Sequence, residues 1–176
     1  KRVPSEYLLR ITPKVHLATK RRDRGVYSRM ALNFPRKTIG YQREKLADLL
    51  GRQARVSRRI YYKEMKESKV VVSPFGWGEI NNRDFEAFIY GCLLIKPSVN
   101  YLVTYPDLFS EGVTYLPFQL DLSDMKEAID TAVNNYSRYR DIAIEGQNRY
   151  IDATLSRNGR EDFVNYFSAL VDDAVV

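Results

Sequence analysis

The sequence has very few of the side chains that build disulfide scaffolds and metal centres. Cys92 is the single cysteine and His16 the single histidine among 176 residues. One cysteine cannot form an internal disulfide, and these two residues cannot supply the clusters of thiolates and imidazoles that bind zinc. The sequence also contains no Asp-x-Asp pair of carboxylates. We therefore expect neither a disulfide-rich scaffold nor a metal site.

Long apolar runs are missing as well. None approaches the roughly 20 residues of a membrane-spanning helix, and no charged-then-apolar leader opens the sequence. With 44% apolar and 12% aromatic residues, the chain can fill the core of one domain. These features predict a cytoplasmic protein. Peripheral association with the inner face of a membrane stays open, because a basic surface suits an anionic leaflet.

The net charge of +6 is divided unevenly along the chain. Residues 1–69 contain 20 Lys and Arg against 6 Asp and Glu, a balance of +14, whereas residues 70–176 have a balance of −8. A basic half favours a phosphate-bearing partner, but the acidic half would repel a long polyanion lying across both. The asymmetry favours a small phosphorylated ligand over nucleic acid. A chance clustering of solvated surface charges is the alternative.

Apolar β-branched runs alternate with segments of helical periodicity. This alternation predicts an α/β fold, with a doubly wound parallel sheet followed by C-terminal helices. We expect a leading segment over residues 1–13, one domain over 14–136, and a helical segment over 137–176 that packs on it. The expected strands are 14–19, 70–72, 92–95 and 113–118; the expected helices are 43–50 with a start near Thr38, 58–68, 83–90, 123–136 and 138–169, the last interrupted near 158–159.

The stretch from residue 70 to residue 91 is the most informative for function. An apolar strand is followed by the turn SPFGWGE (73–79) and then by a helix with Asn81 or Asn82 as N-cap. In open α/β sheets, ligands bind outside the carboxyl ends of the strands. Gly76 and Gly78 would admit a ligand close to the backbone, and the free amides of the helix start suit a diphosphate.

Two charged side chains of the same helix fit a nucleotide. Arg83 can bind phosphate oxygens through two parallel hydrogen bonds, and Glu86, one turn later, can accept hydrogen bonds from a ribose diol. The alternative is an ordinary glycine turn before an amphipathic helix that carries an Arg83–Glu86 ion pair. The turn is neither a G-x-G-x-x-G fingerprint nor a phosphate-binding loop with G-K-[ST], so hydride transfer and ATP hydrolysis are poorly supported.

The segment SKVVVSPFGWGEINNRDFEAFIYGCLLIKP (68–97) resembles the donor-site segment of GT-B glycosyltransferases. It is similar to the group 1 and exostosin-like enzymes, which carry the pattern S-P-x-G-x-G-E…R-D-x-E-A…G…K-P. The resemblance covers about half the chain and extends over these further segments: SRRIYYKEMKESK (57–69), TYPDLF (104–109), GVTYLPF (112–118) and DLSDMKEAI (121–129).

The resemblance implies a single Rossmann-like domain, the C-terminal, nucleotide-sugar-binding half of a GT-B fold. Matched position by position, Glu86 becomes the ribose ligand, and Arg83 with the amides of residues 76–79 becomes the phosphate site. Glu79 could contact the sugar or cap the following helix. The implied donor is a UDP- or GDP-sugar, the acceptor is a glycan or a lipid-linked molecule, and the acceptor domain lies outside these 176 residues. The catalytic residue stays unknown.

Two further arginines are candidate ligands of the phosphates or the nucleotide, because of their positions relative to the expected strands and helices. Arg22 lies in a loop after the first expected strand, which would open at the ligand edge of the sheet and bring a cation to the phosphates. Arg58 opens an expected helix and could approach the nucleotide. The alternative for both residues is a solvated surface charge. His16 is the default general base by its ordinary pKa, but its place within an expected strand favours a structural role.

Three functions follow, in order of preference. The first is the donor-binding domain of a glycosyltransferase. The second is a nucleotide- or glycan-binding module without catalysis, because Ser98, Tyr101 and Leu120 depart from the family pattern. The third is a nucleic-acid-binding domain, which the basic first half suggests and the acidic second half opposes.

Overall fold

The structure is a computed structural model that describes residue 8 and residues 10–174. The expected leading segment, 1–13, lies largely outside the described residues. Its last residues enter a short 3-10 helix, η1 (Thr12–Lys14).

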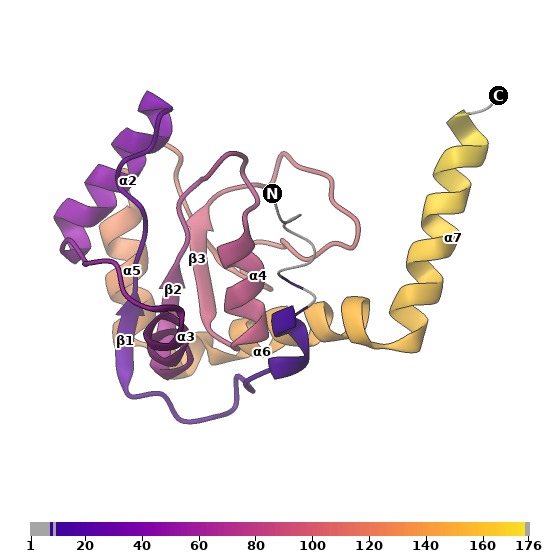
Figure 1. Cartoon of the computed structure of the whole chain (residues 1–176), viewed down its shortest axis with the longest axis horizontal. Coiled ribbons are helices and arrows are strands. Elements are labelled where there is room, and N and C mark those ends of the chain that lie inside the picture. The colour runs from indigo at the N-terminus through magenta and orange to yellow at the C-terminus, as the bar shows by residue number, and fades with distance from the viewer. Residues whose placement is uncertain (1–7, 9, 175–176) are drawn as a thin grey trace.

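Four short strands form one parallel sheet in the middle of the molecule (Figure 1). They lie in the order β1-β2-β3-β4, so each strand pairs with its neighbour in the sequence. Their bounds are β1 (Arg24–Tyr27), β2 (Ser68–Val72), β3 (Leu93–Pro97) and β4 (Leu116–Phe118). The prediction of an α/β fold with a parallel sheet is confirmed.

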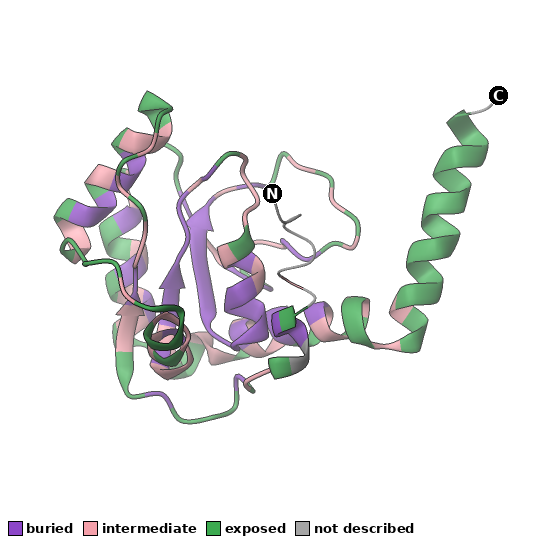
Figure 2. Ribbon diagram, viewed as in Figure 1, coloured by how far each residue is buried: buried purple, intermediate pink, exposed green. Residues whose placement is uncertain are grey.

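Helices cover both faces of the sheet. Val71 of β2 packs in one core with α3 and α4, whereas Val70 and Val72 pack in a second core with α2 and α5. Successive side chains of a strand point to opposite faces, so the two pairs of helices lie on opposite sides. Both faces of the central strands are therefore buried (Figure 2). The helices are α2 (Lys37–Leu50), α3 (Arg58–Glu67), α4 (Asn82–Ile89) and α5 (Met125–Asn134).

The expected strand over residues 14–19 is wrong. The segment after η1 is a loop whose backbone groups bind the end of α4 and the side chains of Gln147, Arg140 and Arg22. The amide of His16 donates to the carbonyl of Ile89 at 2.9 Å, and the amide of Ala18 donates to Oε1 of Gln147 at 2.8 Å. Alternating polarity marks an extended backbone, but these partners replace a neighbouring strand. The first strand is β1, which begins ten residues later.

Residues 70–91 fold as expected. Asn81 is the N-cap of α4: its side chain accepts a hydrogen bond from the amide of Arg83 at 2.9 Å, and Asp84 accepts one from the amide of Asn81 at 3.0 Å. This reciprocal capping box fixes the start of the helix. Gly91 follows the last turn with φ of 61°, a conformation that glycine adopts without strain.

The C-terminal helices differ from one another. α6 (Tyr136–Leu155) packs against α4 and the sheet, and Gly146 lets it approach Phe88 closely. α7 (Arg157–Ala174) has no buried residue and extends away from the body (Figures 1 and 2). Of the segment 137–176 that was expected to pack on the domain, α6 packs on it, whereas α7 contacts the body through the rings of Phe163 and Tyr166, which lie against Tyr105. The break between the two helices falls at Ser156, slightly before the expected position.

No helix within the described part of the chain combines the length and the apolar character needed to cross a bilayer.

Candidate functional site

The turn over residues 73–81 joins the carboxyl end of β2 to the start of α4 (Figure 1). The carboxyl end of β1 lies beside it, because β1 and β2 are parallel neighbours. This is the edge of the sheet where the sequence predicts a ligand.

The two glycines of the turn lie close to a buried cation. The amide of Gly76 donates to the carbonyl of Gly78 at 3.0 Å, and a Cβ built on Gly76 would stand 3.8 Å from Nη2 of Arg43. Neither glycine has a positive φ, so neither is required by backbone conformation. Glu79 is half-buried, and its carbonyl accepts a hydrogen bond from Nζ of Lys96 at 2.9 Å.

Arg43 and Arg83 meet at this edge from two different helices. Arg43 of α2 donates to the carbonyls of Phe75, at 3.0 Å, and Ala31, at 2.8 Å. Burial, and then the charge of Arg83, lowers the pKa of Arg43 to about 10, so it remains a cation at neutral pH. Arg83 donates to the carbonyl of Arg29, while its buried Nε has no hydrogen-bond partner among the described residues. The two guanidiniums thus bind carbonyls two residues apart in the segment after β1. The carboxylate of Glu86 lies near Arg83, and one donor of Arg83 is unused.

Glu86 lies deeper than the sequence suggests. Its side chain is buried, and Oε2 accepts a hydrogen bond of 2.6 Å from the hydroxyl of Tyr61. Burial first of all, and also the neighbouring Glu86 carboxylate, raises the pKa of Tyr61, so the phenol stays protonated and donates. A ribose diol would reach this carboxylate only if the Tyr61 hydroxyl moved away.

Arg22 lies at the opposite edge of the sheet from the turn. Its guanidinium donates to the carbonyl of Lys66 at 2.7 Å, at the end of α3, and to that of Tyr90 at 2.6 Å, at the end of α4. Because its loop precedes β1 instead of following it, the loop opens at the amino ends of the strands. The expected place of Arg22 beside the phosphates is therefore wrong, and the residue binds two helix C-termini.

Arg58 is exposed in the first turn of α3, after the N-cap Ser57. Its contact with a phosphate stays a prediction.

His16 lies at the amino edge too, away from the turn. Its pKa is lowered by burial first and then by Arg22, Lys66 and Lys20, so the neutral imidazole is favoured. These surroundings fit a structural role for His16.

The lowered pKa of His16 makes the free energy of unfolding depend on pH in a direction that unfolding experiments can test. The unfolded state takes up a proton near the ordinary value of about 6.5, whereas the folded state resists it. His16 therefore contributes stability above about pH 6.5 that is lost as the pH falls through the folded pKa. We expect urea unfolding at pH 7.5 and 5.5 to show a smaller loss of stability for His16→Gln than for the unchanged protein. Equal losses would contradict this, and the imidazole would then titrate normally.

Sequence reasoning missed the side chains that surround the turn. Arg43 and Tyr61 come from α2 and α3, which are distant in the sequence, and only the fold brings them to α4. Trp77, at the tip of the turn, is 67% exposed, and the guanidinium of Arg36 lies 5.3 Å from its ring centre. A tryptophan between the two glycines of the turn was the one local feature of the sequence that could have indicated this surrounding.

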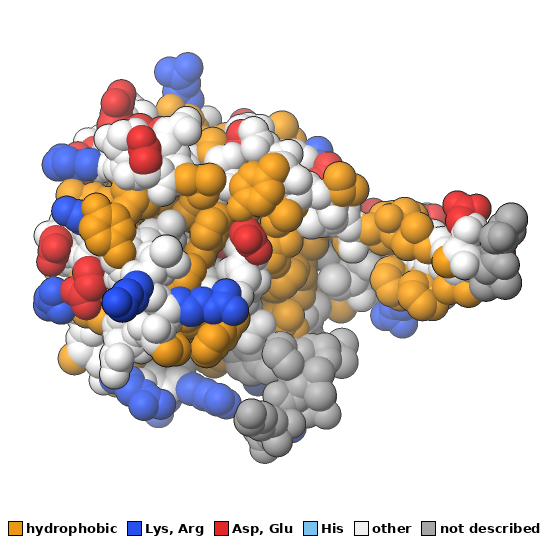
Figure 3. Space-filling view, turned by 90° about the horizontal axis from the view of Figure 1, so that it is seen from above, with side chains coloured by type: hydrophobic (Ala, Val, Ile, Leu, Met, Phe, Trp, Pro, Cys, Tyr) orange, Lys and Arg blue, Asp and Glu red, His pale blue; other side chains and the backbone are white. Residues whose placement is uncertain are grey.

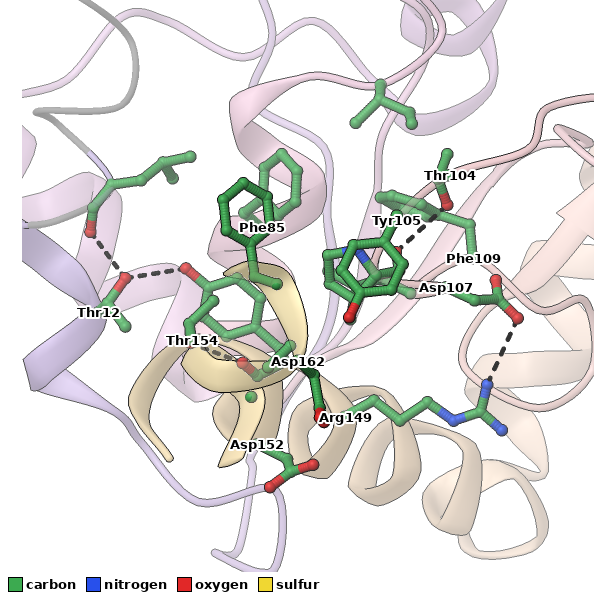
Figure 4. A pocket seen from close by; sticks show the side chains of 18 residues that line it. Thr12, Phe85, Thr104, Tyr105, Asp107, Phe109, Arg149, Asp152, Thr154 and Asp162 are labelled. Atoms are coloured by element: carbon green, nitrogen blue, oxygen red, sulfur yellow. Dashed lines mark hydrogen bonds and ion pairs between the residues drawn. The ribbon is translucent and has the colours of Figure 1, made fainter. Parts of the chain in front are cut away.

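A separate apolar cleft of about 1080 Å³ lies between α4, α6, α7 and the loop over residues 104–109 (Figure 4). Aromatic rings dominate its walls, and Arg149 and Asp107 form an ion pair of 3.9 Å at one side. Thr12 and the hydroxyl of Tyr150 lie 2.8 Å apart at the other. None of the predicted site residues lines this cleft. Its aromatic residues are Phe85, Tyr105, Phe109, Tyr150 and Phe163.

Among residue 8 and residues 10–174, no group of three or more His, Cys, Asp or Glu side chains is placed to hold a metal ion.

Comparisons with known proteins identify no relative. No model of a protein family matches the chain, and a search of the curated proteins finds no match. The resemblance to glycosyltransferases therefore stays a prediction from the residues of the chain.

Proposed function

We propose that this chain is the donor-binding domain of a glycosyltransferase, with a Rossmann-like fold that binds a nucleoside-diphosphate sugar at the carboxyl edge of β1 and β2. The observation that carries the proposal is the meeting of Arg43 and Arg83 beside the turn over 73–81. A diphosphate would bring negative charge to Arg43, which forms no ion pair with a carboxylate among the described residues, whereas Arg83 already lies near Glu86. The diphosphate would also offer an acceptor to the unused Nε of Arg83.

The same groups fit the chemistry of sugar transfer. When the bond between the sugar and the diphosphate breaks, negative charge develops on the departing nucleoside diphosphate. The two arginines and the positive end of the α4 dipole would stabilise that charge without a metal ion. Exposed Trp77 would offer a flat surface beside the phosphates. Glu86 would take the ribose after displacing the Tyr61 hydroxyl.

The acceptor, a glycan or a lipid-linked molecule, requires a second domain in this proposal. α7 supports that part, because hydrophobic side chains run along the exposed helix (Figure 3). A neighbouring domain would cover them. The exposed apolar residues of α7 are Phe163, Val164, Tyr166, Phe167, Leu170 and Val171.

Calorimetric titration with UDP, GDP and their sugars tests donor binding. We expect saturable binding by the unchanged protein and at least a tenfold weaker affinity for Arg83→Met, since a charge-assisted pair of hydrogen bonds is lost. Arg21→Gln is the control, because Arg21 is a fully exposed cation paired only with the exposed Asp23. Absence of nucleotide binding, or equal affinities in all three proteins, would refute the proposal. The thermal unfolding of each variant shows that the fold is kept.

Two other functions give different results in the same experiments. A binding module without catalysis would bind the nucleotide but transfer no sugar even when an acceptor domain is supplied. A nucleic-acid-binding domain would bind oligonucleotides with an affinity that falls steeply as salt rises.

A further inference from the structure

Lys96 and Asp84 form an ion pair that is completely shielded from solvent. Nζ of Lys96, on β3, lies 2.7 Å from Oδ2 of Asp84, in the first turn of α4, and both side chains are 0% exposed. The ring of Phe109 covers the ammonium at 4.6 Å. A buried pair of this kind adds little net stability, because desolvation of the two charges offsets their attraction. The role of the ion pair therefore lies in the groups that Lys96 and Asp84 bind.

Every other bond of the pair ends on the turn over residues 73–81 or at its boundaries. Asp84 accepts a hydrogen bond of 2.5 Å from Oγ of Ser73, where the turn begins, and one of 3.0 Å from the amide of Asn81, where it ends. Lys96 donates to the carbonyl of Glu79, in its second half, at 2.9 Å. The pair therefore holds the turn at both ends and at one interior point.

The turn also has anchors outside this pair: Gln42 accepts a hydrogen bond of 2.8 Å from the amide of Phe75, and Arg43 donates to the carbonyl of the same residue. The pair differs from these anchors because it binds both ends of the turn and Glu79. Trp77 at the tip of the turn is largely exposed, and Gly76 and Gly78 contribute no side chain.

The ammonium of Lys96 uses two of its three donors on Asp84 and the Glu79 carbonyl, and its complete burial under the Phe109 ring keeps it from a ligand.

We propose that Lys96 and Asp84 are positioning residues for the donor site: they hold the turn over 73–81 in the shape that receives the diphosphate, and they touch no ligand themselves. The ligand in this inference rests on the proposed function, whereas the anchoring of the turn does not. The pair acts through the backbone of residues 76–79, which lies beside Arg43.

The test replaces both charges at once, with Lys96→Met and Asp84→Leu in one protein. Exchanging a buried ion pair for apolar residues of similar size is often neutral for stability, whereas removing one partner leaves an uncompensated charge. Two quantities are then measured: hydrogen exchange of the amides of residues 75–80, and the affinity for UDP and GDP by calorimetry. The control is Arg149→Met with Glu145→Leu, which removes a 2.8 Å ion pair of α6 away from the turn.

We expect the double variant to stay folded with a thermal midpoint lower by about 10 °C, because the Ser73 hydroxyl, the Asn81 amide and the Glu79 carbonyl lose their partners. The turn amides should exchange at least tenfold faster, and nucleotide should bind at least tenfold more weakly. The control should change neither quantity. Unchanged exchange and unchanged affinity in a folded double variant would overturn the inference. If the unchanged protein binds no nucleotide, the proposed function fails, and the exchange rates still decide whether the pair anchors the turn.

If the double variant does not fold, Ser73→Ala provides a second test of the same inference. This change removes the hydrogen bond to Asp84 and a longer contact of 3.3 Å with the side chain of Asn81, and it leaves the ion pair intact. We expect about threefold faster exchange in the turn and a matching loss of affinity. Unchanged exchange and affinity in this variant would also count against the inference.

Discussion

Arg22→Met should lower the free energy of unfolding by about 3 kcal/mol or more, because a charged hydrogen bond to a buried partner contributes about 1.5–3 kcal/mol. The 5% exposed side chain of Arg22 supplies the donors for carbonyls at the ends of α3 and α4. Methionine fills the space but donates nothing, so these carbonyls lose their partners. Thermal unfolding should show a midpoint lower by about 10 °C for a chain of this length.

Arg21→Gln is the matched control for this experiment. Its side chain is 90% exposed and pairs only with Asp23 at the surface, so we expect a change within about 0.5 kcal/mol. Arg22→Lys separates charge from geometry, since lysine keeps the cation but lacks the planar fork that reaches two helix ends. If Arg22→Met were as stable as the control and bound nucleotide more weakly, Arg22 would be a ligand and not a helix cap.

Gly91→Ala should be at least as damaging, by about 3 kcal/mol or more. Gly91 has φ of 61°, which costs alanine about 1–2 kcal/mol, and an added Cβ would lie 2.5 Å from the amide nitrogen of Ala18. Because that contact is with backbone, it cannot be relieved by a side-chain rotation. The loop that carries His16 and Ala18 must move away from the end of α4. Urea unfolding measures the cost.

Gly112→Ala isolates the conformational part of this effect. Gly112 has a similar φ of 70°, but nothing lies within 4 Å of the position of its Cβ. We expect only the conformational cost there, about 1–2 kcal/mol. Equal losses at both positions would mean that the loop over residues 15–18 adapts freely and does not pack tightly on α4.

The sequence predicts local features of this protein better than distant ones. The β2–turn–α4–β3 unit could be predicted because its signals are adjacent: a β-branched run, two glycines, an N-cap asparagine and a second apolar run. The loop at 14–19 could not, because alternating polarity does not reveal whether the partner is a strand or the side chain of Gln147 on a distant helix. Because the first strand was expected before Arg22 and lies after it, Arg22 was expected at the carboxyl edge of the sheet and lies at the amino edge.

The candidate site shows the same limit. Arg83 and Glu86 are recognisable on their own helix, but the burial of Glu86 under Tyr61 depends on α3. Arg43 enters from α2 on the other face of the sheet, and no spacing in the sequence relates it to Arg83. The periodicity of α7 predicts a helix correctly, yet an apolar stripe is the same whether it faces a core or solvent.

The consecutive order of the strands has a consequence for how the chain acquires its structure. Each strand docks beside the one synthesised before it, so no strand must be inserted between two that have already paired. The sheet can therefore grow from β1 to β4 while the chain is still being made. The exception is the loop near His16 and Ala18, whose backbone partners include Gln147 of α6. That loop is made before the four strands and completes its hydrogen bonds only after α6 has been made.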